Sequence, residues 1–149
     1  MTKIEKVLFT GKTHTTASHA GASGGHGNLD IQLTTPGNRT APAYAYEAVQ
    51  SHPTAEQLFA GAWSACYIAA LGLAAKELKV DVPADLSVEI EVDLGMAGAG
   101  YFLQGRIQVN LRGVEQQAAE AVAKLADEIC PYSKATRGNI DVALTVVTA

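Results

Sequence analysis

The chain has 149 residues, with 11 lysines and arginines against 15 aspartates and glutamates and a formal net charge of -4. Because these charges are scattered without long runs of one sign, we expect neither nucleic acid nor an anionic membrane surface as a partner. The length fits one domain, residues 1–149, with a single core. Residues 1–6 mix charged and apolar side chains rather than forming an apolar export signal, so we expect a cytoplasmic protein.

Two strands are predicted near the N-terminus, at residues 4–10 and 29–35, from their alternating apolar and polar side chains. A loop rich in glycine, serine and histidine is expected at residues 17–28. A long irregular connection with three prolines is expected at residues 36–53. Loops of this length in compact domains often carry function.

The uncharged segment 57–75 predicts the central helix of the fold. Residues 54–57 fit a capping box at its start, and the helix is expected to run to about Lys79. Its length approaches that of a membrane span, but it is rich in small residues and Glu56 and Lys76 enclose it closely. We therefore expect no membrane span, but a core helix that is buried on every side. Complete burial in so small a domain suggests help from a second subunit.

The second half of the chain predicts strands at residues 86–94 and 101–111, which form an antiparallel hairpin around a glycine-rich turn. A helix is expected at residues 114–129, stopped by Pro131, and a closing strand at residues 140–147. This order shows no strand-helix-strand alternation. It predicts an α+β fold with antiparallel sheets around the buried central helix.

The two cysteines, Cys66 and Cys130, are the candidate reactive groups. In a reducing compartment a cysteine pair is more often catalytic, redox-sensing or metal-binding than a structural disulfide, although a free cysteine also often packs simply as core. The chain has four histidines, but neither a Cys-x-x-Cys nor a His-x-x-x-His pattern. The spacing therefore indicates no metal site.

The positions of the cysteines predict unequal roles. Cys66 lies about three turns into the central helix, beyond the reach of its N-terminal dipole, so a reactive Cys66 needs a cation or hydrogen-bond donor from elsewhere. Cys130 lies at the C-terminal end of a helix, where free carbonyls disfavour a thiolate, and Pro131 takes it out of helical geometry. Cys66 is therefore the better nucleophile, and Cys130 suits condensation with an oxidised partner.

Residues 56–67 (EQLFAGAWSACY) and 130–142 (CPYSKATRGNIDV) form two long motifs in this order. They resemble the signature segments of the organic hydroperoxide resistance proteins, the Ohr branch of the Ohr/OsmC family. The similarity extends to residues 5–10 and 29–33, and so over nearly the whole chain. It implies an OsmC-like α+β fold and an intertwined homodimer, with one buried central helix in each subunit and the active sites at the interface.

The resemblance also implies a cysteine-based peroxidase that acts on organic hydroperoxides, binds no metal or organic cofactor, and is reduced by a lipoylated protein or another dithiol. Cys66 matches the peroxidatic cysteine, Cys130 the resolving cysteine and Glu56 the active-site glutamate of the family. Ten residues on a straight helix span about 15 Å. For Glu56 and Cys66 to serve one site, we expect the helix to kink or break, at Gly61.

One residue of the family does not carry over. These proteins usually hold an arginine in the first glycine-rich loop, which pairs with the glutamate and stabilises the thiolate, and here His19 stands in its place. Three alternatives are open: His19 acts as an imidazolium, Arg39 substitutes from the long loop, or the protein is a weakened or redirected relative. The last would be a redox-sensing or binding dimer with weak or no peroxidase activity, or an OsmC-type peroxidase of different substrate range. Arg137 is expected to fix the turn before the last strand, with a catalytic role as the alternative.

Overall fold

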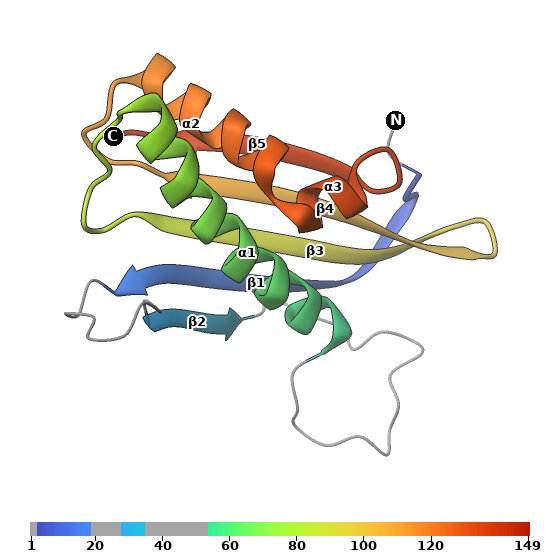
Figure 1. Ribbon diagram of the computed structural model, residues 1–149. Coiled ribbons are helices and arrows are strands. Elements are labelled where there is room, and N and C mark those ends of the chain that lie inside the picture. The colour runs from blue at the N-terminus through green and yellow to red at the C-terminus, as the bar shows by residue number, and fades with distance from the viewer. Residues whose placement is uncertain (1–2, 19–27, 35–53) are drawn as a thin grey trace.

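The computed structural model describes residues 3–18, 28–34 and 54–149. In chain order the described residues form β1 (Lys6–Ser18), β2 (Asn28–Thr34), α1 (Ala55–Leu78), β3 (Ser87–Ala97), β4 (Gly100–Asn110), α2 (Gln116–Ile129), α3 (Pro131–Thr136) and β5 (Asp141–Val147). The strands make one sheet in the order β2-β1-β3-β4-β5, and the helices cover one of its faces (Figure 1). The predicted α+β class with a central helix is confirmed.

The sheet is mixed rather than antiparallel. The β1–β2, β1–β3 and β3–β4 pairs are antiparallel, as predicted for the β3–β4 hairpin, but β4 and β5 pair in parallel. Parallel neighbours need a crossover connection, and α2 with α3 supplies it on the helical face. The expectation of antiparallel sheets without a strand-helix-strand unit is therefore wrong, because the closing strand enters the same sheet from the other end.

The first strand is much longer than the predicted segment 4–10. β1 extends to Ser18 because it pairs with β3 along one edge and with β2 along the other, so two ladders hold residues whose own pattern is weak. β2 begins at Asn28, close to the predicted start. The connection expected at residues 36–53, and residues 19–27 of the expected loop, lie outside the described residues.

Helix α1 begins as the sequence predicts. The Thr54 hydroxyl accepts a hydrogen bond from the Gln57 amide at 3.2 Å, and the Gln57 side chain accepts one from the Thr54 amide at 2.9 Å. The helix then runs without interruption through Gly61, so a break there is wrong, whereas a kink at Gly61 stays a prediction. Gly61 serves packing instead, because an added Cβ would lie 3.2 Å from the Leu33 side chain of β2.

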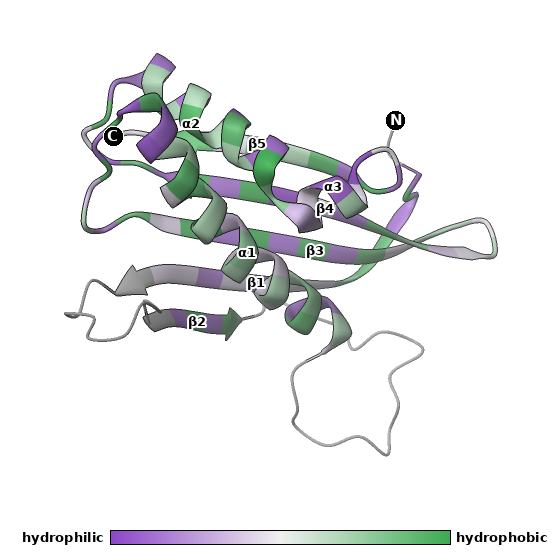
Figure 2. Cartoon of the chain, in the orientation of Figure 1, coloured by the Kyte–Doolittle hydropathy of each residue, from purple (hydrophilic) through white to green (hydrophobic). Residues whose placement is uncertain are grey.

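The core lies between α1, α2 and the sheet. Trp63, Tyr67 and Leu71 of α1 are fully buried against strand residues that alternate inward, such as Val88 and Ile107. By length and composition α1 could cross a membrane, but 56% of its apolar window is buried inside the fold. Figure 2 shows α1 coloured toward hydrophobic along most of its length, whereas α2 has distinct hydrophobic and hydrophilic sides.

The outer side of α1 is exposed in the single chain. Leu58 and Leu73 on this side have 56% and 59% of their surface exposed. Burial of α1 on every side is therefore not achieved within one chain. The helix is central to the fold, but its far side is left open.

Candidate functional site

The fold brings the two cysteines together although 64 positions separate them in the chain. The Cys130 thiol donates a hydrogen bond to the Cys66 sulfur, with the two Sγ atoms 3.5 Å apart. Both are free thiols. A disulfide requires about 2.05 Å between the sulfurs. The pair is therefore reduced and needs a shift of only about 1.5 Å to form that bond.

The two thiols differ in exposure. Cys130 is fully buried, with 0% of its surface exposed, whereas Cys66 is partly exposed. A reagent that arrives from solvent meets Cys66 first. This difference agrees with the unequal roles that the sequence positions indicate.

The corner between α2 and α3 holds Cys130 in place. Cys130 ends α2, where its amide donates to the Ala126 carbonyl, and its φ of -60° and ψ of 120° are non-helical. Pro131 then occupies the first turn of α3, a position that suits proline because no amide donor is needed there. Pro131 thus stops one helix, as predicted, and also opens a short second helix that the sequence pattern did not reveal.

The surroundings of Cys66 act on its ionisation in opposite directions. Burial raises the pKa of the Cys66 thiol, and the proximity of the Cys130 thiol raises it further. The backbone amide of Tyr132 hydrogen-bonds to the Cys66 sulfur and lowers the pKa. Across residues 3–18, 28–34 and 54–149, this amide is the donor that favours the thiolate. The position of Cys66 in the helix predicts a need for a hydrogen-bond donor from elsewhere in the fold. A backbone amide cannot be identified as that donor from the residue types in the sequence.

Glu56 lies in the first turn of α1 and is buried. Its backbone lies against β1, because a Cβ added to Gly11 would approach the Glu56 carbonyl carbon to 2.6 Å. On the uninterrupted helix the Cα atoms of Glu56 and Cys66 are about 15 Å apart. The structure brings Cys130 to Cys66, and the place of Glu56 in the same site stays a prediction. His19 and Arg39 lie outside the described residues.

Two aromatic side chains of α1 support the cysteine pair from inside the core. The Trp63 indole donates to the Ser133 hydroxyl at 3.2 Å, and the Tyr67 hydroxyl donates to the Ala123 carbonyl at 2.8 Å. Burial raises the pKa of Tyr67, so the phenol stays neutral and acts as a donor. Both residues are fully buried in the core.

Arg137 lies in the second motif but does not approach the sulfurs through any described contact. Its guanidinium donates to the backbone carbonyl of Asp127 at 2.9 Å and to the Asp127 carboxylate at 2.6 Å. It therefore ties the end of α3 to α2. This agrees with the structural role expected for it before the last strand.

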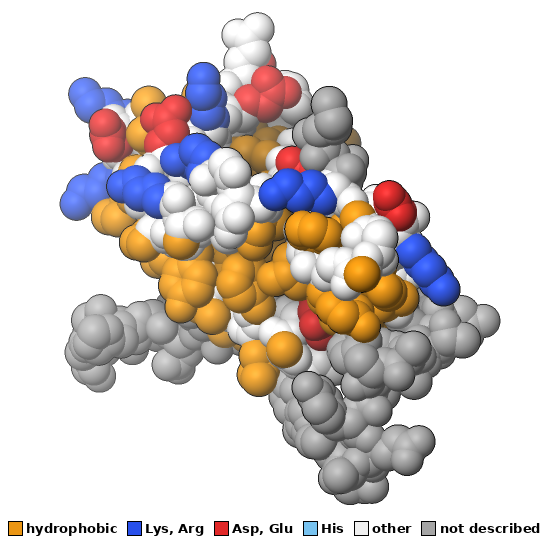
Figure 3. All heavy atoms as spheres, turned by 90° about the vertical axis from the view of Figure 1, so that its right-hand side faces the viewer, with side chains coloured by type: hydrophobic (Ala, Val, Ile, Leu, Met, Phe, Trp, Pro, Cys, Tyr) orange, Lys and Arg blue, Asp and Glu red, His pale blue; other side chains and the backbone are white. Residues whose placement is uncertain are grey.

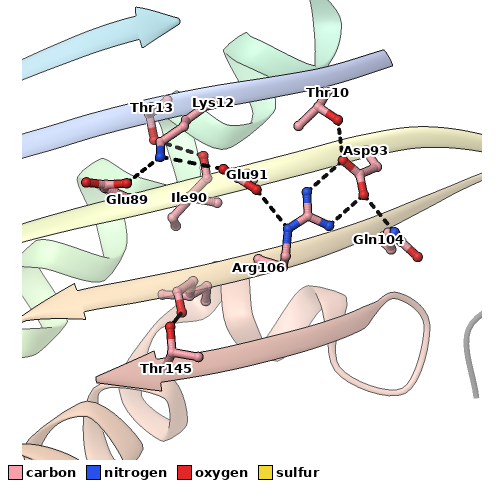
Figure 4. Close-up of polar contacts among 11 residues, drawn as sticks. Thr10, Lys12, Thr13, Glu89, Ile90, Glu91, Asp93, Gln104, Arg106 and Thr145 are labelled. Carbon is pink, nitrogen blue, oxygen red and sulfur yellow. Dashed lines mark hydrogen bonds and ion pairs between the residues drawn. The ribbon is translucent and has the colours of Figure 1, made fainter. Parts of the chain in front are cut away.

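A second polar cluster lies on the outer face of the sheet, away from the cysteines (Figure 4). Arg106 binds the Asp93 carboxylate through two nitrogens at 2.6 and 2.8 Å and reaches Glu91 at 2.8 Å. Thr10 and Gln104 also donate to Asp93. These groups lie beside a hollow of about 260 Å³, and among the described residues the buried Gln104 side-chain oxygen has no hydrogen-bond partner. Within the part of the chain that the structure describes, no three His, Cys, Asp or Glu side chains gather as metal ligands.

Comparison with known proteins places this site in a family. Residues 48–145 match the sequence model of the OsmC-like proteins. The chain is 32% identical to the organic hydroperoxide resistance protein of Xanthomonas axonopodis pv. citri, covering 98% of this chain and 99% of that protein. It is 36% identical to the organic hydroperoxide resistance protein OhrA of Bacillus subtilis, covering 79% and 80%.

Solved structures agree with the sequence relatives. The crystal structure of an organic hydroperoxide resistance protein from Elizabethkingia anophelis has a TM-score of 0.64 and 30% identity, covering 92% of this chain and 96% of that one. OhrB of Bacillus subtilis has a TM-score of 0.61 and 31% identity, covering 90% and 96%. With its cysteine pair and its fold both described, the chain belongs to the OsmC-like family, in the branch of the organic hydroperoxide resistance proteins.

Proposed function

We propose that this protein is a thiol-dependent peroxidase that reduces organic hydroperoxides to alcohols. The observation that carries the proposal is the pair of free thiols 3.5 Å apart, one partly exposed and one fully buried. Relatives that align over most of the chain are named organic hydroperoxide resistance proteins. Hydroperoxide reduction by two thiols uses this arrangement directly.

In the first step the Cys66 thiolate attacks the distal oxygen of the hydroperoxide. The O–O bond breaks, the leaving alkoxide takes a proton and departs as the alcohol, and Cys66 becomes a sulfenic acid. Cys66 takes this part because its sulfur is the more exposed of the two and accepts a hydrogen bond from the Tyr132 amide.

In the second step the Cys130 thiol condenses with the sulfenic acid. A sulfur–sulfur bond forms, the S–O bond of Cys66 breaks, and the hydroxyl leaves as water with the Cys130 proton. An external dithiol then reduces the disulfide by thiol–disulfide exchange. We propose a dihydrolipoyl group, on a lipoylated protein, as this reductant, with no cofactor bound to the protein itself and a cytoplasmic location.

The substrate class follows from the packing of Cys66. The Cys66 side chain packs against the apolar core, as do the partly buried side chains of Phe59 and Ile129. An apolar site gains free energy by burying a carbon chain, so alkyl and fatty acid hydroperoxides are favoured over hydrogen peroxide.

Ionisation of Cys66 needs more than the Tyr132 amide, because burial raises the pKa of the thiol. In our proposal His19 or Arg39 supplies positive charge to Cys66, and Glu56 holds that group in position. The exposed side of α1, with Leu58 and Leu73, is covered by a second copy of the chain, which makes the active form a homodimer.

The test is hydroperoxide consumption with tert-butyl hydroperoxide and dihydrolipoamide. We expect turnover by the wild type, no consumption by Cys66→Ser, and a single turnover followed by arrest in Cys130→Ser. Intact mass after one equivalent of hydroperoxide should show the loss of two hydrogens in the wild type. Absence of turnover in the wild type would refute the enzyme, and full turnover in Cys66→Ser would refute the assigned nucleophile.

A second candidate function is redox sensing or binding by a dimer with weak or no peroxidase activity. It is favoured by the raised pKa of Cys66, which slows reaction with peroxide. A sensor would form the disulfide once, yet would not be recycled quickly by dihydrolipoamide. Comparison of His19→Ala and Arg39→Ala with the wild type separates the two, since a turnover enzyme loses rate in the variant that lacks its activating cation.

A further inference from the structure

A second contact joins α1, which carries Cys66, to α3, which begins directly after Cys130. The Trp63 indole N–H of α1 donates to the Ser133 hydroxyl of α3 at 3.2 Å. Trp63 lies three residues before Cys66, and Ser133 lies three residues after Cys130. Trp63 and Cys66 share a face of α1, because residues three apart on a helix do so. Ser133 lies in the first turn of α3, which Cys130 caps, so both contacts join α1 to the segment that begins at Cys130.

The sheet fixes the position of the Trp63 indole. Trp63 is fully buried, and its ring lies so close to Gly105 of β4 that an added Cβ would be 3.2 Å from Cζ3. The Phe59 ring packs against it edge-on, with ring centroids 5.8 Å apart and planes at 77°. The indole N–H therefore has one available direction, and the buried Ser133 hydroxyl stands there.

Ser133 belongs to the short helix that begins directly after Cys130. The Cys130 carbonyl accepts from the Lys134 amide at 3.0 Å, so the first turn of α3 includes the cysteine backbone. A fixed Ser133 thus fixes the direction from which the Cys130 sulfur faces Cys66. We propose that Trp63 and Ser133 are positioning residues that align Cys130 for attack on the oxidised sulfur of Cys66. The inference rests on the proposed peroxidase function and deepens its second step.

Two reactions compete for the sulfenic acid of Cys66. In the productive one the Cys130 thiol forms the sulfur–sulfur bond, and the sulfenic hydroxyl leaves as water with the thiol proton. In the other, a second hydroperoxide transfers an oxygen to the same sulfur, its O–O bond breaks, an alcohol leaves and a sulfinic acid remains. Orientation of two reacting groups contributes strongly to the rate of the step that joins them. Loss of alignment therefore shifts the outcome toward sulfinic acid without touching the first step.

The test is rapid-quench intact mass spectrometry of the full-length protein mixed with tert-butyl hydroperoxide. Ser133→Ala and Trp63→Phe each remove one partner of the hydrogen bond. We expect wild-type rates of Cys66 oxidation in both, with disulfide formation slowed about fivefold, as the loss of one buried hydrogen bond implies. The sulfinic acid fraction should rise accordingly as the hydroperoxide concentration increases. Ser133→Thr, which keeps the hydroxyl, should restore the wild-type partition.

Thr136→Val is the matched control. Thr136 is a buried residue of the same helix, and its hydroxyl bonds to the Ser133 backbone carbonyl rather than to α1. It should behave as the wild type. A wild-type ratio of disulfide to sulfinic acid in Ser133→Ala overturns the inference. Slower disulfide formation in Thr136→Val, or slower Cys66 oxidation in the Ser133 and Trp63 variants, also overturns it, because either result means that the fold as a whole has loosened. If Trp63→Phe fails to fold, Ser133→Ala decides alone. A wild type without Cys66 oxidation instead refutes the proposed function.

Discussion

The Cys66 sulfur is held between one group that opposes its ionisation and one that favours it. The Cys130 thiol raises the pKa of Cys66, and the Tyr132 amide lowers it. These two groups act in opposite senses. With Cys130 present, the pKa of Cys66 is therefore higher, and the thiol less reactive, than it would be beside the Tyr132 amide alone.

The first prediction concerns the ionisation of Cys66 in Cys130→Ala. Removal of the Cys130 thiol removes an influence that raises the pKa of Cys66, so the pKa should fall and alkylation at neutral pH should accelerate. The pH dependence of iodoacetamide alkylation measures this. Ser64→Ala, in the same helix with its hydroxyl directed to the Gly61 carbonyl, is the control and should leave the midpoint unchanged. An unchanged or higher midpoint in Cys130→Ala would contradict the account.

The second prediction concerns Asp93 on the outer face of the sheet. Burial alone would raise the pKa of Asp93, but hydrogen bonds from Arg106, Thr10 and Gln104 outweigh burial and lower it. A carboxylate with a lowered pKa stabilises the folded state above its ordinary pKa of about 3.9, and this contribution is lost as pH falls through the lowered value. Asp93→Asn should therefore lose about 2 kcal/mol of unfolding free energy at neutral pH.

Urea denaturation at pH 7 and pH 3 measures the effect. The difference in stability between wild type and Asp93→Asn should be largest at pH 7 and shrink in acid, because the contribution of the carboxylate begins to be lost once the pH falls below the ordinary aspartate pKa of the unfolded chain. Glu77→Gln, at an exposed position of α1, is the control and should change little at either pH. An equal loss of unfolding free energy at pH 7 and pH 3 would mean that Asp93 stabilises the fold by packing rather than by its charge.

The close approach of β1 to α1 sets the geometry of the helix start. A Cβ added to Gly11 would lie 2.5 Å from the Gln57 amide nitrogen and 2.6 Å from the Glu56 carbonyl carbon. Backbone atoms cannot rotate away as a side chain does. Only glycine therefore lets the strand pass the first turn of the helix, where Glu56 stands.

The third prediction is that Gly11→Ala forces β1 and α1 apart. Overpacking of this kind costs about 1–3 kcal/mol, and we expect the upper part of that range because both contacts are with backbone. Thermal and urea unfolding measure the loss. Gly72→Ala is the matched control, since nothing lies within 4 Å of a Cβ added there, and its stability should not fall. Equal stability of Gly11→Ala and wild type would refute the close approach.

Local sequence signals predicted those elements whose stability is local. The capping box at Thr54 and the alternating β3–β4 hairpin follow from neighbouring residues alone. The direction of β5 and the full length of β1 do not, because both depend on pairing with strands distant in the chain. Pro131 predicts the end of α2 correctly. A proline also suits the first turn of a helix, and this second use, which begins α3, has no further signal in the sequence.

The candidate site likewise has parts that the sequence predicts and parts that only the folded structure reveals. The different positions of Cys66 and Cys130 on their helices, together with the resemblance, were enough to name the pair. Their 3.5 Å contact depends on the whole fold, and the Tyr132 amide carries no side-chain signature. Gly61 was expected to interrupt the helix near the site, but a glycine also permits close packing, and that is the use the fold makes of it.

At the scale of the molecule, the exposed side of α1 is the main feature without a cover in the single chain. Leu58 and Leu73 project from it, and hydrophobic side chains also gather on the face seen in Figure 3. Exposed apolar patches on folded proteins commonly mark contact with another protein. The homodimer in our proposal places a second copy there.

The fourth prediction is that Leu73→Glu weakens this dimer. Transfer of a charged side chain into an apolar interface is costly, so the equilibrium should move toward monomer. Sedimentation velocity over a range of protein concentrations measures it, and Ala121→Glu, at an exposed position of α2, should leave association unchanged. A wild type that is monomeric at all concentrations would refute the dimer without affecting the cysteine contact.

The parallel position of β5 also orders events during synthesis of the chain. Cys66 leaves the ribosome 64 residues ahead of Cys130. The corner that holds Cys130 lies within the crossover to β5, whose last residue, Val147, pairs with Asn110. The Val147 and Thr148 carbonyls accept hydrogen bonds from the Leu111 and Gly113 amides. Translation must therefore reach the end of this strand before the crossover can close. Under the proposed mechanism, a nascent chain until then carries Cys66 without Cys130, and oxidation at that stage would yield a sulfenic acid that the same chain cannot convert to a disulfide.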